Sequence, residues 1–258
     1  MRVLLLVLLG WVAVAGADDG QVRHLHLVGD STLMRRTEAD PIGSWGEALG
    51  GYLVPGRSIS NWALGGKTVV TIEPSWTNAV PSIARGDIVI FQFGINDAAP
   101  KKLVPEDRFK ARLGEFVDIV RSHGAWPMIC APLSRVGYGR EDDGKPFAPS
   151  ADRRQYRDYA RELADAKRVD FVDMTALSEK WLAGLSRKEA LGYCIGDTTE
   201  NGESWFDATH PTKLAAREYA RLFVDEVRRR GLPIAAWLEG FPRGGDKQCK
   251  GKTEARRL

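Results

Sequence analysis

Residues 87–97 read Asp-Ile-Val-Ile-Phe-Gln-Phe-Gly-Ile-Asn-Asp, and this stretch decides the fold class. Its first seven residues form an almost continuous apolar run, which is the pattern of a strand covered on both faces. Such strands belong to parallel sheets that are packed between helices. The run stops at Gly94, and a polar Asn-Asp pair follows at once. The sequence therefore predicts a buried parallel strand that ends in a turn with polar side chains.

Segments on both sides of this strand alternate between strand and helix patterns. Strands are expected at 22–28, 58–61, 126–131 and 169–172, and helices at 41–53, 109–120, 156–163 and 216–227. This alternation predicts an α/β protein in three α/β/α layers, with a five-stranded parallel sheet. A long surface loop is expected at 134–150. Binding sites in such folds lie beyond the carboxyl ends of the strands.

The N-terminus has the features of an export signal. Arg2 precedes an apolar run at 3–14, and small residues at 15–17 precede an acidic pair, which predicts a signal peptide at 1–17. The run is shorter than the ~20 residues of a membrane-spanning helix. We therefore expect a secreted or periplasmic monomer with no stable membrane anchor, whose hydrolase domain occupies 18–242 and is followed by a basic, flexible tail at 243–258.

Charge and cysteine content exclude several function classes. The whole chain carries a net charge of only +3, and the basic residues of the tail exceed that number, so no concentrated basic surface indicates nucleic acid as a partner. Cys130, Cys194 and Cys249 show no CxxC spacing, so neither a metal site nor a redox motif is predicted. Cys130 fits a core strand, and a Cys194–Cys249 disulfide is left open.

Gly29-Asp30-Ser31 follows the first predicted strand. A serine hydroxyl becomes a useful nucleophile when a neighbouring base removes its proton. The same three residues are equally typical of a turn that caps the next segment.

Two further strand ends carry possible hydrogen-bond donors. The second strand is followed by Gly65-Gly66-Lys67-Thr68, which resembles the end of a phosphate-binding loop, but Asn61 stands where that motif needs glycine. A glycine N–H there either donates to an oxyanion or belongs to a plain turn. Asn96 follows the third strand; its amide either donates to a developing negative oxygen or helps Asp97 to stabilise a turn.

Asp207-Ala208-Thr209-His210 precedes the last predicted helix. An aspartate three residues before a histidine can hold the imidazole N–H and fix its tautomer. Of the other histidines, His24 and His26 are expected on the polar face of the first strand, and His123 ends a helix. His210 is therefore the candidate base, and the alternative is that Asp207 simply caps the helix.

The order of these motifs resembles the SGNH (GDSL) hydrolase family over residues 22 to 230. The resemblance implies a flavodoxin-like fold and catalysis without a metal or cofactor. It implies Ser31 as nucleophile and first oxyanion donor, with Gly66 and Asn96 as further donors. It also implies that Asp207 and His210 act as the acid and the base.

Within that family, the segments 41–46 and 61–68 are similar to the rhamnogalacturonan acetylesterase branch, whose members remove acetyl groups from pectin. Ile95 and Pro211 differ from residues common there. The resemblance implies an acetylated polysaccharide or oligosaccharide as substrate. Trp62 and Trp205 either stack on its sugars or pack in the core.

Three alternative functions remain open. They are a GDSL lipase or lysophospholipase, a carbohydrate-binding protein without catalysis, and a metal-dependent phosphatase using Asp30, Asp97 and His210. The charged loop at 134–150 favours a polar substrate.

Overall fold

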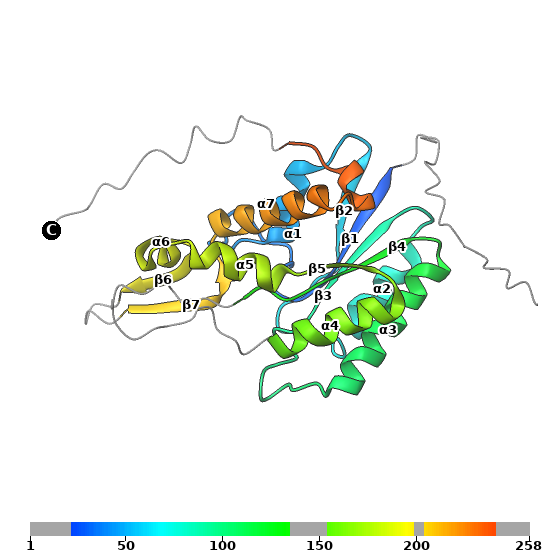
Figure 1. Ribbon diagram of the computed structural model, residues 1–258, viewed down its shortest axis with the longest axis horizontal. Coiled ribbons are helices and arrows are strands. Elements are labelled where there is room, and N and C mark those ends of the chain that lie inside the picture. The colour runs from blue at the N-terminus through cyan, green and yellow to red at the C-terminus, as the bar shows by residue number, and fades with distance from the viewer. Residues whose placement is uncertain (1–21, 135–153, 199–203, 241–258) are drawn as a thin grey trace, which may run out of the picture.

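A computed structural model describes residues 22–134, 154–198 and 204–240 (Figure 1). The predicted signal peptide, most of the predicted surface loop and the predicted tail lie outside these residues. Within the described part of the chain, no helix is long and apolar enough to cross a membrane.

The centre of the fold is a five-stranded parallel sheet, as the apolar runs predict. Its strands lie in the order β2-β1-β3-β4-β5. Their bounds are β1 (Arg23–Gly29), β2 (Arg57–Asn61), β3 (Ile88–Gln92), β4 (Trp126–Cys130) and β5 (Asp170–Val172). Because the chain moves outward in one direction from β1 to β2 and in the other from β3 to β5, the order reverses between β1 and β3. Ligand sites of doubly wound sheets lie at the carboxyl ends of the strands beside such a reversal.

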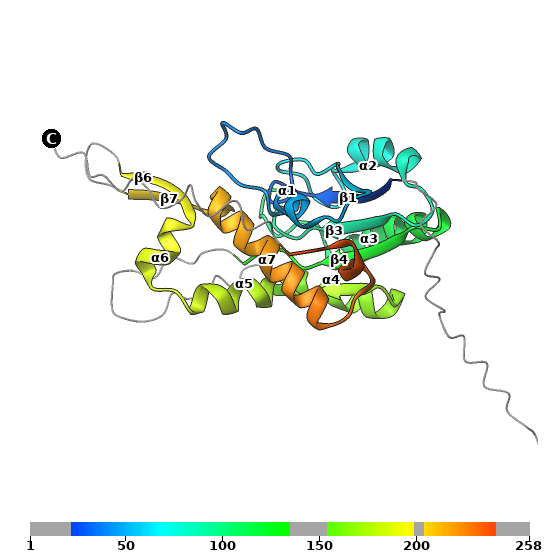
Figure 2. The same ribbon diagram turned by 90° about the horizontal axis from the view of Figure 1, so that it is seen from above.

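Helices cover both faces of the sheet (Figures 1 and 2). One face carries α1 (Trp45–Ala48), η1 (Leu49–Tyr52) and α7 (Lys213–Arg229), and the other carries α2 (Glu73–Ala79), η2 (Val80–Ser82), α3 (Glu106–Ser122) and α4 (Arg154–Lys167). Alternation along β1 separates the two cores, because Leu25 and Leu27 pack on the α7 side and Val28 on the α3 side. The predicted three-layer architecture is therefore confirmed.

Several elements were not predicted. Beyond β5 the chain forms α5 (Met174–Ala183), α6 (Arg187–Gly192) and an antiparallel hairpin of β6 (Cys194–Thr198) and β7 (Ser204–Pro211), and η3 (Pro233–Trp237) follows α7. These helices and strands are short or carry no sustained apolar period, which is the signal that sequence reading depends on. The hairpin projects beyond the end of the sheet in Figure 2.

His26 was expected on the polar face of β1, and this expectation is wrong because the residue is only 1% exposed. Its Nε2 lies 3.1 Å from Asp87 Oδ2, and Trp62 Nε1 donates to its Nδ1 at 3.1 Å. An indole N–H can only donate, so Nδ1 must be unprotonated and Nε2 must carry the proton. The α2–α3 layer covers this face, and the ring is tolerated there because both nitrogens are paired. Trp62 is thereby directed into the protein and packs against the second core, which favours the core reading of this residue.

Candidate active site

The turn after β1 presents Ser31 at the sheet reversal. Gly29 has no room for a side chain, because a Cβ there would lie 2.5 Å from the carbonyl oxygen of Gln92 on the neighbouring strand. Asp30 Oδ1 accepts the Thr32 backbone N–H at 3.0 Å, and Thr32 Oγ1 lies 2.8 Å from Gln92 Oε1. Gln92 is fully buried and also accepts from Trp45 Nε1 at 3.0 Å. The turn is therefore fixed to β3 through the side chain of Thr32, which Asp30 Oδ1 in turn holds in place.

The structure brings Ser31, His210 and Asp207 together from positions 179 residues apart in the chain. His210 Nε2 lies 2.8 Å from Ser31 Oγ, and His210 Nδ1 lies 2.6 Å from Asp207 Oδ2. An ionised carboxylate only accepts hydrogen bonds, so Nδ1 carries the imidazole proton and Nε2 is free to accept the serine hydroxyl. This is the geometry of a nucleophile, a base and an orienting acid.

Asp207 and His210 lie on β7, at the end of the hairpin, and not in a loop before the last helix. Asp207 Oδ1 accepts the backbone N–H groups of Thr209 at 2.8 Å and of His210 at 3.0 Å. Burial alone would raise the pKa of Asp207, but the hydrogen bond from the His210 ring and these two backbone groups hold it below its usual value. The separate possibility that Asp207 caps α7 is wrong, because Thr212 caps that helix by accepting from Ala215 N.

Three hydrogen-bond donors remain free beside the serine. The buried Asn96 Nδ2 has no partner among the described residues. Within the same part of the chain, the backbone N–H groups of Ser31 and Gly66 donate to no protein acceptor. The Gly65 N–H is used by Met34 Sδ at 3.1 Å, which favours Gly66 as the donor from this loop.

The loop that carries Gly66 approaches the nucleophile closely. A Cβ built on Gly65 would lie 3.9 Å from Ser31 Cβ. Gly66 has a φ of +72°, a left-handed conformation that glycine adopts without a steric penalty. Ser31, Gly66 and Asn96 thus come from three different strand ends and meet at one edge of the sheet.

Asp97 ties two of these strand ends together. Its Oδ1 accepts from Val69 N and its Oδ2 from Gly94 N, both at 2.9 Å. The side chain is completely buried, and burial raises its pKa to about 6 despite these hydrogen bonds. Asp97 thus stabilises the turn after β3, which is one of the two alternatives that the sequence left open for this Asn-Asp pair. Because both of its carboxylate oxygens accept hydrogen bonds from backbone N–H groups, Asp97 is not positioned as a metal ligand.

The sequence did not single out two cationic side chains that contact the site. Arg36 Nη2 donates to the Ser31 carbonyl oxygen at 3.0 Å, and the same guanidinium lies 3.3 Å from Asp40. Lys102 Nζ donates to the Gly66 carbonyl oxygen at 2.7 Å. Neither residue stands in a motif, and the contacts depend on loops that meet only in the folded chain.

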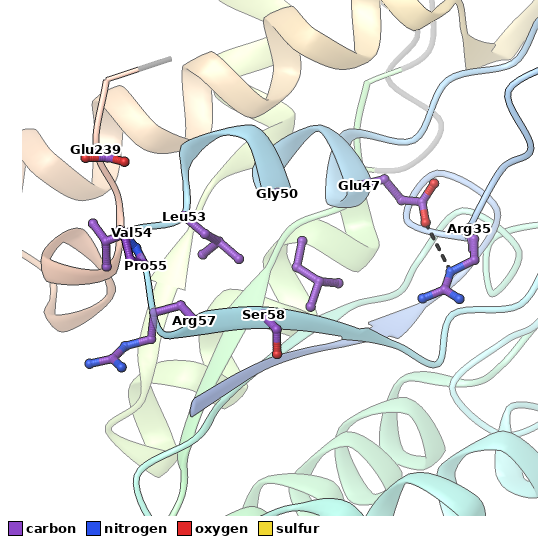
Figure 3. Close-up of a pocket in the computed structure, with 10 residues that line it drawn as sticks. Arg35, Glu47, Gly50, Leu53, Val54, Pro55, Arg57, Ser58 and Glu239 are labelled. Atoms are coloured by element: carbon purple, nitrogen blue, oxygen red, sulfur yellow. Dashed lines mark ion pairs between the residues drawn. The ribbon is translucent and has the colours of Figure 1, made fainter. Parts of the chain in front are cut away.

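Other candidate groups lie apart from this site. Among the described residues, no cluster of three His, Cys, Asp or Glu side chains could hold a metal ion. Cys194 is a buried free thiol, and Cys249 lies outside the described residues. A cavity of about 470 Å³ between η1 and the edge strand β2 is lined by residues such as Leu53, Arg57 and Glu239 and by none of Ser31, Asp207 and His210 (Figure 3).

The chain is similar to several known esterases. It is 28% identical to the probable rhamnogalacturonan acetylesterase YesY of Bacillus subtilis over 218 residues, which is 82% of this chain and 95% of that protein. It is 26% identical to the rhamnogalacturonan acetylesterase RhgT of the same organism, over 81% of this chain and 90% of that one. The crystal structure of Bacillus subtilis YxiM superposes with a TM-score of 0.71 and 25% identity over 82% of this chain, which spans only 57% of YxiM.

The GDSL-like lipase/acylhydrolase family matches residues 27–217, which include Ser31, Asn96, Asp207 and His210. The match covers most of the chain, and both YesY and RhgT are named acetylesterases. The chain therefore belongs to the GDSL-like lipase/acylhydrolase family and is a carboxylic ester hydrolase.

Proposed function

We propose that the protein is an acetylesterase that removes O-acetyl groups from rhamnogalacturonan by way of an acetyl-enzyme on Ser31. The observation that carries this proposal is the continuous set of contacts from Ser31 Oγ to His210 and on to Asp207, at 2.8 and 2.6 Å. A serine hydroxyl in such an arrangement is activated by the base beside it.

In the proposed mechanism, Ser31 Oγ attacks the acetyl carbonyl carbon while its proton passes to His210 Nε2. Asp207 stabilises the imidazolium that forms, and the new oxyanion accepts hydrogen bonds from Ser31 N, Gly66 N and Asn96 Nδ2. The tetrahedral intermediate collapses, and the departing sugar oxygen takes the proton from His210. Water then attacks the acetyl-serine with His210 as base, which releases acetate and restores Ser31.

The substrate part of the proposal is supported by the relatives. The matches to YesY and RhgT extend over nine-tenths or more of those proteins, and both are named for rhamnogalacturonan deacetylation. Segments 41–46 and 61–68 carry the corresponding sequence resemblance, and the second of them contains Gly66. We further propose that residues 1–17 direct export, which predicts a mature protein beginning at Asp18 when the secreted form is analysed by mass spectrometry.

The test is acetate release from acetylated rhamnogalacturonan, acetylated xylan and acetylated sialic acid, with Ser31→Ala measured beside the wild type. We expect release from rhamnogalacturonan to be fastest and to be abolished in the variant. Release that is faster from another substrate would refute the proposed polymer only. Equal activity of Ser31→Ala and wild type on every ester would refute the proposed mechanism.

A second candidate function is hydrolysis of longer acyl esters. Leu64, Leu103 and Leu214 are exposed by 39%, 62% and 47%, and each lies within four residues of Gly66, Lys102 or His210 along the chain. A contiguous apolar surface beside the ester site would favour a lipid-like acyl chain. Comparing p-nitrophenyl acetate with the octanoate separates the two candidates, since faster turnover of octanoate would support the second.

A further inference from the structure

Lys102 connects two loops of the proposed oxyanion site. The residue lies between β3 and α3, and its backbone N–H donates to the Ala99 carbonyl at 2.8 Å, which holds it close to the turn after β3. Its Nζ donates to the Gly66 carbonyl oxygen at 2.7 Å and lies 3.5 Å from Asn96 Oδ1. One ammonium group therefore joins the loop after β2 to the loop after β3.

The chemistry of these groups fixes the orientation of the Asn96 amide. An ammonium group only donates hydrogen bonds, so it favours the amide orientation in which Oδ1 faces it and Nδ2 faces away. In that orientation Nδ2 is buried and has no partner among the described residues. A buried donor without a partner is costly, and a site for a transient anion is one reason for a protein to keep one.

The shorter of the two contacts secures the ammonium in place. The Gly66 carbonyl oxygen anchors Nζ at 2.7 Å, and the longer contact to Asn96 acts as a charge–dipole interaction. A positive charge beside Oδ1 draws electron density away from the amide nitrogen, which makes the N–H a stronger donor to an anion.

We propose that Lys102 is a positioning residue of the esterase, which orients and polarises the Asn96 amide so that Nδ2 stabilises the oxyanion. This inference rests on the proposed function, because it assumes that Asn96 meets an oxyanion formed on attack by Ser31. It adds a residue outside the sequence motifs to the site. Preorganised donors of this kind act on kcat, because the charge that they stabilise exists only in the transition state.

The alternative is an ordinary solvated lysine. Ion pairs and hydrogen bonds of exposed lysines contribute little, and their removal leaves chemistry unchanged. Lys101 is the matched control, since it is exposed, adjacent and of equal charge. Lys101→Met and Lys102→Met lower the net charge equally, so only an effect of position distinguishes them.

The experiment is a double-mutant cycle on p-nitrophenyl acetate, with Lys102→Met, Asn96→Ala and the combined variant. We expect Lys102→Met to lower kcat by about 10-fold with KM changed less than about 2-fold, and Lys101→Met to behave as wild type. In the Asn96→Ala background the same replacement should change kcat by less than about 2-fold, because its target is gone. Lys102→Arg, which keeps the charge, should retain more kcat than Lys102→Met.

The outcomes separate this inference from the proposed function. If wild type and Ser31→Ala hydrolyse the ester equally, the proposed function fails and the role of Lys102 fails with it. If activity depends on Ser31 but Lys102→Met equals wild type, or lowers kcat by the same factor with and without Asn96, only the role of Lys102 is overturned. Thermal unfolding of each variant, measured in parallel, verifies that the compared proteins are folded at the assay temperature.

Discussion

Replacing Asp207 by Asn should stop catalysis through the tautomer of His210 and not through loss of the fold. Asp207 Oδ1 accepts two backbone N–H groups, at 2.8 and 3.0 Å, so an asparagine is held with its oxygen at this position. Its NH₂ group then replaces Oδ2 and donates to His210 Nδ1. The imidazole proton is forced onto Nε2, which faces Ser31 Oγ as a donor and no longer accepts the serine proton.

The expected loss of kcat follows from the free energy that is needed to restore the productive tautomer of His210. Recovering the productive tautomer requires the amide to flip, which places NH₂ against both backbone N–H groups. Each hydrogen bond lost at this part-buried position costs roughly 0.5–1.5 kcal/mol. Loss of the carboxylate charge beside the imidazolium adds to this, so we expect kcat to fall by about 10³- to 10⁴-fold, as roughly 1.4 kcal/mol corresponds to a factor of ten.

The chain offers a matched control in its second His–Asp pair. Asp87 contacts His26 at 3.1 Å and accepts backbone N–H groups from His24 and Ala84, but it precedes β3 at the amino end of the sheet, opposite the site. Asp87→Asn should lower the free energy of unfolding by about 1–3 kcal/mol and leave kcat unchanged. Both variants are measured by p-nitrophenyl acetate hydrolysis and by urea unfolding. A loss below about 10-fold in Asp207→Asn, or an equal loss in Asp87→Asn, would refute the tautomer argument.

Four further results are expected. Gly29→Ala should destabilise by about 2–3 kcal/mol in urea, because its Cβ would lie 2.5 Å from a carbonyl oxygen; an unchanged midpoint would contradict the packing described for β1 and β3. Gln92→Leu should cost roughly 3 kcal/mol in the same assay, since it leaves the partners of a fully buried amide unsatisfied, and a loss under about 0.5 kcal/mol would contradict this. The pKa of Asp97, raised from 3.8 to about 6, gives the native state the higher proton affinity, so its stabilising contribution is full below about pH 4 and lost as the pH rises through about 6. Between pH 4 and 7, the urea midpoint of the wild type should therefore fall relative to that of Asp97→Asn. Midpoints of the two proteins that change in parallel with pH would contradict this. Burial raises the pKa of Cys194 to about 11, so the native protein should show no rapid labelling of this thiol by dithionitrobenzoate, whereas rapid labelling at Cys194 in a peptide map would argue against its burial.

Different features of this protein depend on different kinds of sequence signal. The nearly continuous apolar run of 88–93 and the alternation of strands with helices specified the layered fold, because burial on both faces favours apolar residues at almost every position of a strand. The polar residues after β1 and β3 made Ser31 and Asn96 candidates for a similar reason, whereas the choice of Gly66 came from the family resemblance. Parallel strands place all of their carboxyl ends at one edge of the sheet, so strand order alone makes such residues neighbours.

Other features depend on contacts between segments whose sequences show no regular apolar periodicity. The hairpin that holds Asp207 and His210 has little apolar alternation, and its position against Ser31 is set by packing across the fold. The burial of His26 depends on the layer of helices above β1, which a single strand cannot reveal.

The sequence by itself determined the fold class and the identity of the groups that can react, because apolar periodicity and strand-end residues are local properties of the chain. Only the tertiary structure decided which of these groups meet. Distances such as 2.8 Å between Ser31 and His210, and 2.7 Å between Lys102 and Gly66, arise from loops far apart in sequence. The physical reason is that the chemical nature of a side chain is set by its residue type alone. Its orientation, its burial and the resulting pKa shifts are produced by neighbours that the fold brings together.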